Sequence, residues 1–345
     1  MIRISNQLIV LSMLSASSLA IAMDKTPIHQ EIVIKEITAI SNPNQVSSLN
    51  NNNALLISNP EGIYTVDWKE NKKTDDILTG KYTFGILPNK QKTAVVVTPI
   101  EEGISIRCKK QLFDIETKKL IWEDNFDINP SFEPSGTFTR SGNLYMVKGD
   151  GNIHCSNGKY YYAREAGTGY KGIITSDPTE EKIFFVKTDN IANQLKSSLC
   201  TTTFNEDLFP QVSSVELPKN STDDIPYARL HSPISKLIAL CYPLSIIWNI
   251  FDQSKKIATD VPDCCLLAFH PNKPFLGILT KDGFVEIRDV IKQTIMAKTN
   301  ESLGTPKDGT AANEGLIDFS QDGENLAVIV NNKCFVLSNL YPKNN

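Results

Sequence analysis

Two stretches near the C-terminus repeat one pattern of apolar and polar positions, fifty residues apart. They span residues 268–290 and 318–340, and in both of them apolar residues alternate with polar ones. A period of two is typical of β-strands rather than helices. The equivalent apolar positions are Phe269 and Phe319, Leu276 and Leu326, Ile278 and Val328, Val285 and Phe335, and Ile287 and Leu337. The pattern therefore predicts short strands that recur in the same order.

Turn-forming residues separate these strands at matching places. The first turn is His-Pro-Asn-Lys at 270–273 in one stretch and Ser-Gln-Asp-Gly at 320–323 in the other. The second turn is Lys-Asp-Gly at 281–283 and Asn-Asn-Lys at 331–333. Asp-Gly and Asn-Asn tolerate the positive φ angles of a tight hairpin. Each unit is thus predicted to run strand, turn, strand, turn, strand.

Other parts of the chain repeat the unit with decreasing clarity. A third copy covers 228–256 and a fourth covers 84–119, and fainter ones fit at 54–73, 132–163 and 173–204. Seven units in residues 23–345 average about 46 residues each, close to the length of a four-stranded propeller blade. A single sheet of this size cannot bury both of its faces, so stacked copies are needed for stability.

The best-defined units resemble WD40-type repeats. Residues 319–332, FSQDGENLAVIVNN, are similar to the turn and strand of that family, and residues 281–293, KDGFVEIRDVIKQ, to its closing strand. Arg288-Asp289 and Trp248-Asn249 stand where Trp-Asp is usual, and the Gly-His dipeptide of the family is missing. The resemblance implies an all-β chain, with residues 23–345 forming a single β-propeller domain, most simply of seven four-stranded blades.

The resemblance also implies how the ring closes. The last unit ends near Leu340 with three of its strands, and in the family an N-terminal segment commonly supplies the missing outer strand. Residues 31–37, EIVIKEI, alternate like a strand ahead of the first repeat. We expect this segment to pair with residues 333–338.

The N-terminus predicts a secretory signal peptide over residues 1–22. Arg3 is the only charge, an apolar run follows at 8–14, and Ala20-Ile21-Ala22 is an A-x-A cleavage pattern. The apolar run is shorter than the ~20 residues that a membrane-spanning helix needs. The exit sequence is typical of bacterial export, so we expect a periplasmic or secreted protein cleaved near Ala22, with no membrane span.

Charge argues against nucleic-acid binding, and the cysteine count limits how many disulfides can form. The net charge is −4, and it becomes −5 when the leader takes Arg3 with it. A mildly acidic chain without a basic block is a poor ligand for nucleic acid, because phosphate neutralisation needs clustered Lys and Arg. The seven cysteines are an odd number, so at least one stays unpaired, and most are expected to be small buried residues.

The motifs of common catalytic and cofactor sites have simpler explanations in this chain. Gly167–Gly172 matches the G-x-G-x-x-G spacing, but no helix is predicted after it to hold phosphate, so it is interpreted as a loop. The four histidines are scattered, and His231 and His270 occupy equivalent repeat positions. Adjacent acids such as Asp75-Asp76 are interpreted as solvated pairs, since the EF-hand spacing is absent. No metal site and no cofactor are expected.

One aromatic run is the candidate for partner binding. Tyr160, Tyr162 and Arg164 fall on one face of a predicted strand, and aromatic residues are enriched at protein interfaces. The alternative is that the tyrosines pack between sheets.

Two functions are compatible with these patterns. The first hypothesis is an exported scaffold that binds a protein or peptide, as a monomer without catalytic activity. The second is a propeller enzyme or small-ligand binder, similar to quinoproteins or lactonases, with a site in the central channel. The inner strands at 266–269 and 316–319 contribute a single acid, Asp318, which favours the first hypothesis.

Overall fold

Every element of regular structure in the described part of the chain is a β-strand, β1 to β29. The computed structural model describes residues 30–49, 53–80, 82–88, 93–99, 107–127, 136–139, 141–147, 153–155, 160–161, 174–176, 182–191, 194–203, 211–216, 227–231, 237–241, 246–249, 256–257, 264–306 and 316–341. The leader expected at residues 1–22 lies outside these ranges. They contain no helix that is long and apolar enough to cross a membrane.

Within these ranges the strands form seven sheets, named I to VII in chain order. Sheet I contains β3 (Gln45–Ser48), β4 (Ala54–Asn59), β5 (Gly62–Asp67) and β6 (Lys72–Thr79). Sheet II contains β7 (Tyr82–Pro88), β8 (Ala94–Pro99), β9 (Arg107–Asp114) and β10 (Leu120–Asp127). Sheet III contains β11 (Gly136–Phe138), β12 (Leu144–Val147), β13 (Ile153–Cys155) and β14 (Tyr160–Tyr161). Sheet IV contains β15 (Ile174–Ser176), β16 (Lys182–Ile191), β17 (Gln194–Thr203) and β18 (Gln211–Glu216). Sheet V contains β19 (Tyr227–His231), β20 (Leu237–Cys241), β21 (Ile246–Asn249) and β22 (Lys256–Ile257).

The last two sheets contain strands from both ends of the described chain. Sheet VI contains β23 (Cys264–Phe269), β24 (Phe275–Thr280), β25 (Val285–Asp289) and β26 (Thr294–Lys298), with β1 (Gln30–Glu31) as a fifth strand. Sheet VII contains β27 (Ile317–Phe319), β28 (Leu326–Val330) and β29 (Lys333–Ser338), with β2 (Val33–Ile37) as its outer strand.

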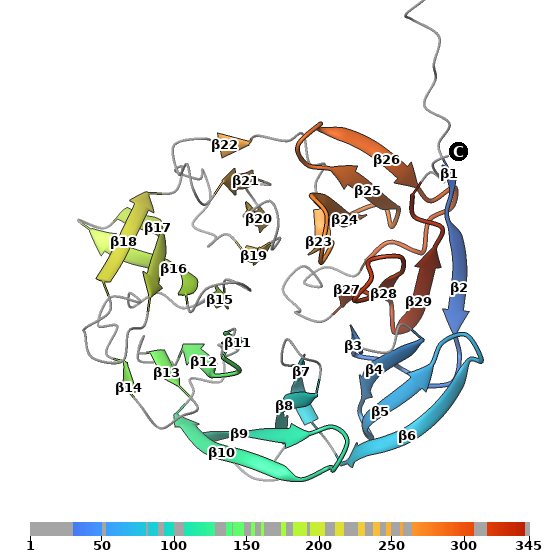
Figure 1. Cartoon of the computed structure of the whole chain (residues 1–345), viewed down its shortest axis with the longest axis horizontal. Helices are drawn as coiled ribbons and strands as arrows, with labels where there is room; N and C mark the ends of the chain where they lie inside the picture. The colour runs from blue at the N-terminus through green and yellow to red at the C-terminus, as the bar shows by residue number, and fades with distance from the viewer. Residues whose placement is uncertain are drawn as a thin grey trace, which may run out of the picture.

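The sheets are arranged around a common centre like the blades of a propeller (Figure 1). In sheets I to V the first strand lies innermost and later strands lie progressively further out, whereas in sheets VI and VII β23 and β27 lie innermost and the N-terminal strands β1 and β2 outermost (Figure 1). The inner strands contact one another in sequence, for example β3 with β7, β23 with β27, and β27 with β3. The polypeptide thus builds each sheet from a local run of residues and buries its faces against the neighbouring sheets.

Residues fifty positions apart in the repeat occupy equivalent pairing positions in sheets VI and VII. Phe269 pairs with Leu276 in sheet VI, and Phe319 pairs with Leu326 in sheet VII. The predicted second turns also adopt positive φ, which is 81° at Gly283 and 62° at Asn332. The strand and turn predictions for these two units are confirmed.

A turn nucleated by aspartate recurs between the third and fourth strands of sheets I, II and VI. In each, the Oδ1 atom of the aspartate that ends the third strand accepts backbone N–H groups two or three residues further on. The residue four positions after the aspartate has positive φ, between 51° and 57°. The aspartates are Asp67, Asp114 and Asp289, and the positive-φ residues are Asn71, Lys118 and Gln293. Asp289 therefore forms this turn even though the residue before it is Arg288, where WD40-type repeats usually have tryptophan.

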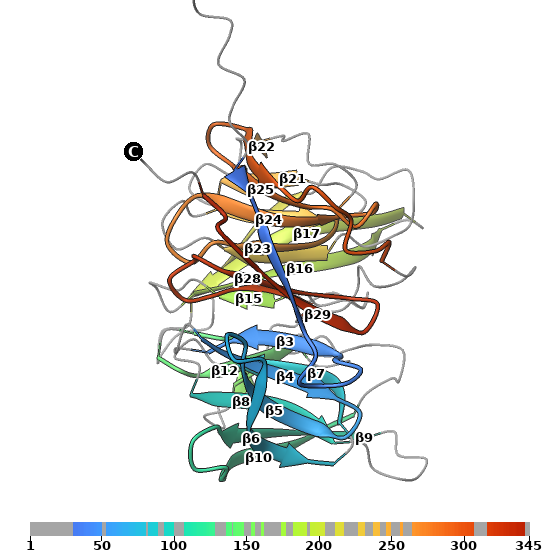
Figure 2. The same cartoon turned by 90° about the vertical axis from the view of Figure 1, so that its right-hand side faces the viewer.

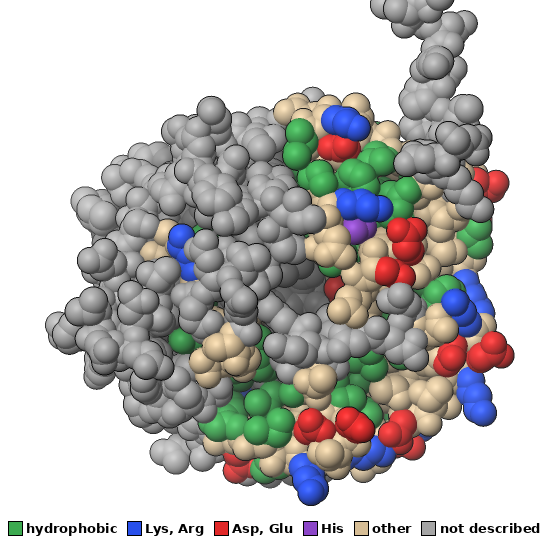
Figure 3. Space-filling model, viewed as in Figure 1, with side chains coloured by type: hydrophobic (Ala, Val, Ile, Leu, Met, Phe, Trp, Pro, Cys, Tyr) green, Lys and Arg blue, Asp and Glu red, His purple; other side chains and the backbone are tan. Residues whose placement is uncertain are grey.

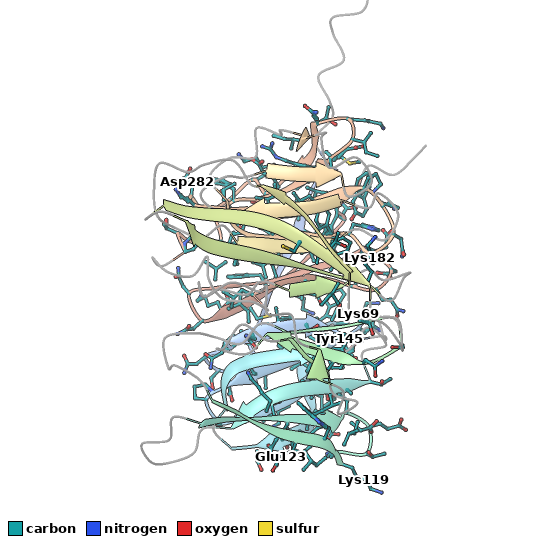
Figure 4. All side chains as sticks on the ribbon, turned by 90° about the vertical axis from the view of Figure 1, so that its left-hand side faces the viewer. Lys69, Lys119, Glu123, Tyr145, Lys182 and Asp282 are labelled. Carbon is teal, nitrogen blue, oxygen red and sulfur yellow. The ribbon has the colours of Figure 1, made fainter. Side chains whose placement is uncertain are left out.

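Alternation of strand direction places the turns of each sheet on two faces of the ring. Asp282, in the turn from β24 to β25, lies toward one face, and Lys69, in the turn from β5 to β6, lies toward the other (Figure 4). The face of the ring shown in Figure 3 is hollowed near its centre.

The described core is continuous across sheets VI, VII and I. Its members include Leu279, Val328 and Ile57, each of which has no measurable exposure. Gly277 on β24 lets sheet VII approach closely, because a Cβ there would lie 3.0 Å from the Leu326 side chain and 3.1 Å from the Phe319 ring. The faces of neighbouring sheets therefore interlock through apolar side chains, as expected from the repeats.

The N-terminal segment expected to form one strand is divided between two sheets. Val33 pairs with Ser338 and Ile37 with Cys334, so β2 lies antiparallel to β29 at the expected residues. Glu31, however, pairs with Lys298 in a parallel arrangement on sheet VI. The buried side chain of Ile32 stands at the break and packs into the core. The segment thus crosses from sheet VI to sheet VII along the outside of the ring (Figure 2).

Candidate functional site

The one acid predicted on an inner strand is engaged by the neighbouring sheet. Asp318 Oδ2 accepts hydrogen bonds from Ser47 Oγ at 2.9 Å and from the backbone N of Ser48 at 2.9 Å. Ser48 Oγ lies 3.0 Å from the same oxygen, and it also donates to the Phe319 carbonyl. A carboxylate held by several donors serves here as a bridge between sheets VII and I.

His270, at the first turn of sheet VI, is fully buried and serves the fold. Its Nδ1 accepts the backbone N–H groups of Asn272 at 2.9 Å and Lys273 at 3.0 Å, so the neutral ring carries its proton on Nε2. Burial, together with the smaller effect of the Lys273 charge, lowers the pKa of His270 to about 4, while the charge of Asp322 opposes this shift. These features describe a neutral structural imidazole.

Aromatic side chains enclose this imidazole between sheets VI and VII. The His270 ring lies 5.8 Å from Phe275, 5.4 Å from Phe319 and 5.6 Å from Tyr341, measured between ring centroids. Its Nε2 has no hydrogen-bond partner among the described residues, and it points at Gly323, where a Cβ would lie only 1.9 Å away. The histidine thus fills an inter-sheet gap that only glycine leaves open.

The adjacent acids on β6 form ion pairs. Asp75 contacts Lys118 of sheet II at 2.7 Å, and Asp76 contacts Lys73 at 2.6 Å. The hydrogen bond from Lys118 lowers the pKa of Asp75. Over the described part of the chain, no three His, Cys, Asp or Glu side chains gather closely enough to hold a metal ion. The Asp75–Lys118 pair instead connects two neighbouring sheets at the rim.

Two cysteines with described side chains are buried thiols. Cys200 on β17 and Cys334 on β29 are both buried, and neither is in a disulfide. Burial raises the pKa of the Cys334 thiol to about 12, so the reactive thiolate is suppressed. The expectation of small buried cysteines is confirmed for these two.

Large apolar side chains are exposed at the rim of the ring. Among the described residues they are Val33 at 55%, Leu120 at 47%, Ile121 at 56% and Ile291 at 63% exposure. Val33 lies on the outer strand of sheet VII, Leu120 and Ile121 lie on the outer strand of sheet II, and Ile291 lies in the turn that leads to β26. On the face of Figure 3, apolar side chains also gather over sheet II.

Sequence reasoning missed these rim positions, although one signal was present. Residues 120–122, Leu-Ile-Trp, are three consecutive apolar residues. Because side chains alternate along a strand, such a run on an outer strand directs at least one apolar group away from the core. The turn residue Ile291 had no comparable signal.

Of the three candidate partner-binding residues, Tyr160, Tyr162 and Arg164, the structure describes only Tyr160. Tyr160 lies on β14, the outer strand of sheet III, where its backbone pairs with His154. Tyr162 and Arg164 lie outside the described residues, as does the Gly167–Gly172 loop. Their role in partner binding stays a prediction.

Comparison with known proteins identifies the fold and no family. No family model matches the chain, and no curated protein matches it. A chain of the crystal structure of the mitotic checkpoint complex is similar with a TM-score of 0.59, covering 93% of this chain and 94% of that chain at 11% sequence identity. At this identity the likeness supports a WD40-like propeller fold and nothing finer.

Proposed function

We propose that this protein is a binding scaffold, a WD40-like propeller that holds a protein or peptide partner on its rim. The observation that carries the proposal is the position of Val33, Leu120, Ile121 and Ile291, the exposed large apolar side chains of the described chain, on outer strands or the turns that lead to them. Exposed apolar groups mark a partner surface where they lie next to one another, as Leu120 and Ile121 do on β10. Tyr160 on the outer strand β14 belongs to the same rim.

We propose also that the protein has no catalytic activity and binds no cofactor. The rival site in the central channel needs convergent acidic or basic groups with free lone pairs or protons. Asp318 is already bonded to Ser47 and Ser48. Because these hydrogen bonds link sheet VII to sheet I, the Asp318 carboxylate is poorly suited to act as a general acid or base.

We propose further that sheets I to VII are the seven blades of one closed ring, with β2 as its lock. The antiparallel pairing of Val33 with Ser338 supports this closure. Cysteines placed at both positions, Val33→Cys with Ser338→Cys, are expected to form an intramolecular disulfide, seen by mass spectrometry of the oxidised full chain. Leu120→Cys with Ser338→Cys is the control pair, and equal cross-linking in both variants would argue against a locked ring.

The site of action is proposed to be the bacterial periplasm or the exterior, after cleavage near Ala22, with the mature protein as a monomer. The first described strand begins at Gln30, beyond the cleavage pattern, which is compatible with this processing. N-terminal sequencing of the exported protein should begin at Met23. A protein that retains Arg3 in its mature form contradicts export by this route.

Site-specific photo-crosslinking in the native envelope tests the binding function. A photoreactive residue at Val33, Ile121 or Ile291 is expected to yield a discrete heterologous adduct. The control position is Asp282, which is exposed on a turn at one face of the ring. No adduct from any rim position, or the same adduct from Asp282, would reject the rim as the binding surface.

A further inference from the structure

The outer strand of sheet II has an exposed apolar pair at its start. Among the described strands β10 pairs only with β9, so its other edge faces outward. Leu120 and Ile121 are 47% and 56% exposed. The register shifts between Leu120 and Trp122, so Ile121 has no counterpart on β9. The bulge therefore presents the Ile121 side chain beside an otherwise regular strand edge.

The same molecule shows that the outer edge of such a sheet accepts another strand. Gln30 and Glu31 form β1, which pairs in parallel with Ala297 and Lys298 on the outer strand of sheet VI. Asn300 Nδ2 also donates to the Glu31 carboxylate at 3.2 Å. The outer-edge geometry of a four-stranded sheet in this fold is thus compatible with a fifth strand.

The charge of β10 distinguishes between possible occupants. The strand reads Leu-Ile-Trp-Glu-Asp-Asn-Phe-Asp, with three acids and no basic residue. Glu123 is exposed at the outer edge of the sheet, where Figure 4 labels it. A second copy pairing antiparallel through the same edge can place Glu123 opposite its own counterpart, and like charges directly opposite each other destabilise a sheet. A strand with Lys or Arg at these positions gains attraction instead.

We propose that the β10 edge binds an extended peptide segment of another protein as a fifth strand of sheet II. Its backbone pairs with β10, a basic side chain faces Glu123, and an apolar side chain contacts Ile121 and Leu120. Backbone hydrogen bonds give such strand addition its affinity, and alternate side chains give it specificity. This inference rests on the proposed rim-binding function and names one partner chemistry for it.

Binding of designed peptides to the full chain tests the proposal. The probe is a nine-residue peptide that alternates lysine with isoleucine and valine, measured by fluorescence anisotropy of a labelled copy. One control peptide replaces every lysine by glutamate, and a second carries N-methyl groups on alternate backbone amides. The lysine peptide is expected to bind at least about tenfold more tightly than either control, because one control lacks the charge match and the other the backbone pairing.

Two matched variants test the location. Ile121→Asp is expected to weaken binding of the lysine peptide at least about tenfold, whereas Thr294→Asp, at an exposed position on β26 of sheet VI, changes it less than about twofold. Glu123→Lys should reverse the preference between the lysine and glutamate peptides. Amide hydrogen exchange of the wild-type chain should slow within residues 120–127 when the lysine peptide binds.

The outcomes separate this inference from the proposed function. Failure of the lysine peptide to bind, binding without protection of 120–127, or equal losses in Ile121→Asp and Thr294→Asp would overturn the β10 site. If cross-linking from Val33 and Ile291 still captures a partner in the Ile121→Asp chain, the scaffold function stands without this edge. If no rim position of the wild-type chain yields a cross-linked partner, both the scaffold function and the β10 site are rejected.

Discussion

Asp318 accepts a hydrogen bond from the backbone N of Ser48 at 2.9 Å, across 270 residues of sequence. Ser48 Oγ lies 3.0 Å from the same carboxylate oxygen. The contact connects the first and last sheets at their inner strands, while β2 connects the ends of the chain at the outside. Two remote parts of the polypeptide are thus joined at both the inner and the outer edge of the ring.

Removal of this carboxylate should destabilise the fold. Asp318→Ala leaves the donors on Ser47 and Ser48 without their acceptor, which costs about 1–3 kcal/mol of unfolding free energy. Urea denaturation followed by circular dichroism measures the change. Asp282→Ala, at an exposed turn, is the control and should alter stability by less than about 0.5 kcal/mol. Equal effects would show that the inner-strand bridge contributes little.

The buried imidazole makes stability depend on pH. The pKa of His270 is about 4 in the folded protein, below its ordinary value of 6.5. The unfolded chain therefore takes up this proton first, and stability present above about pH 6.5 is lost as the pH falls toward 4. The full contribution is about 3 kcal/mol at most.

His270→Asn isolates this effect, because an Asn Oδ1 can accept the same turn N–H groups without titrating. Unfolding free energies at pH 7.5 and pH 4.5 should differ less in this variant than in the wild type. The other charged groups near the ring, Lys273 and Asp322, are unchanged in the variant. Identical pH dependence in both proteins would contradict a neutral buried His270.

Two glycines with similar backbone angles should respond differently to alanine. Gly323 has φ +76° and its Cβ would meet His270 Nε2, whereas Gly142 has φ +84° with no atom within 4 Å of a Cβ. Gly142→Ala should cost about 1 kcal/mol from the left-handed backbone alone. Gly323→Ala should cost about 3 kcal/mol, since the clash is added. Thermal and urea unfolding of the pair measures the difference, and equal costs would mean that the imidazole moves aside freely.

In the turn after Asp289, glycine should stabilise the protein only at the position that adopts positive φ. Gln293 has φ 56°, a conformation that is unfavourable for residues with a Cβ. Gln293→Gly removes that strain and should stabilise the protein by about 0.5 kcal/mol, after the entropy of glycine is subtracted. Lys292→Gly, one residue earlier in the same turn, should instead destabilise it. Differential scanning calorimetry compares the two, and the reverse order would contradict the turn geometry.

Local residues predicted the strands and turns because each of those features depends on neighbours in sequence. The alternation in 268–290 and 318–340 determined the register of sheets VI and VII, and Asn332 adopts the positive φ that its residue type favours. The aspartate turns at Asp67, Asp114 and Asp289 are equally local. In contrast, the expected pairing of residues 31–37 with 333–338 came from the family resemblance, since no local pattern encodes a contact between these two segments.

The candidate site depended almost wholly on tertiary structure. The sequence by itself determined an all-β repeat chain with apolar faces, and it identified Asp318 as the single acid on the two inner strands at 266–269 and 316–319. Only the folded ring decided that Asp318 is bonded to Ser48, that Glu31 joins a different sheet from Val33, and that Ile121 is exposed. The physical reason is that hydrogen-bonding propensity and side-chain polarity belong to single residues, whereas a partner 270 residues away and the exposure of an edge exist only once the sheets have packed.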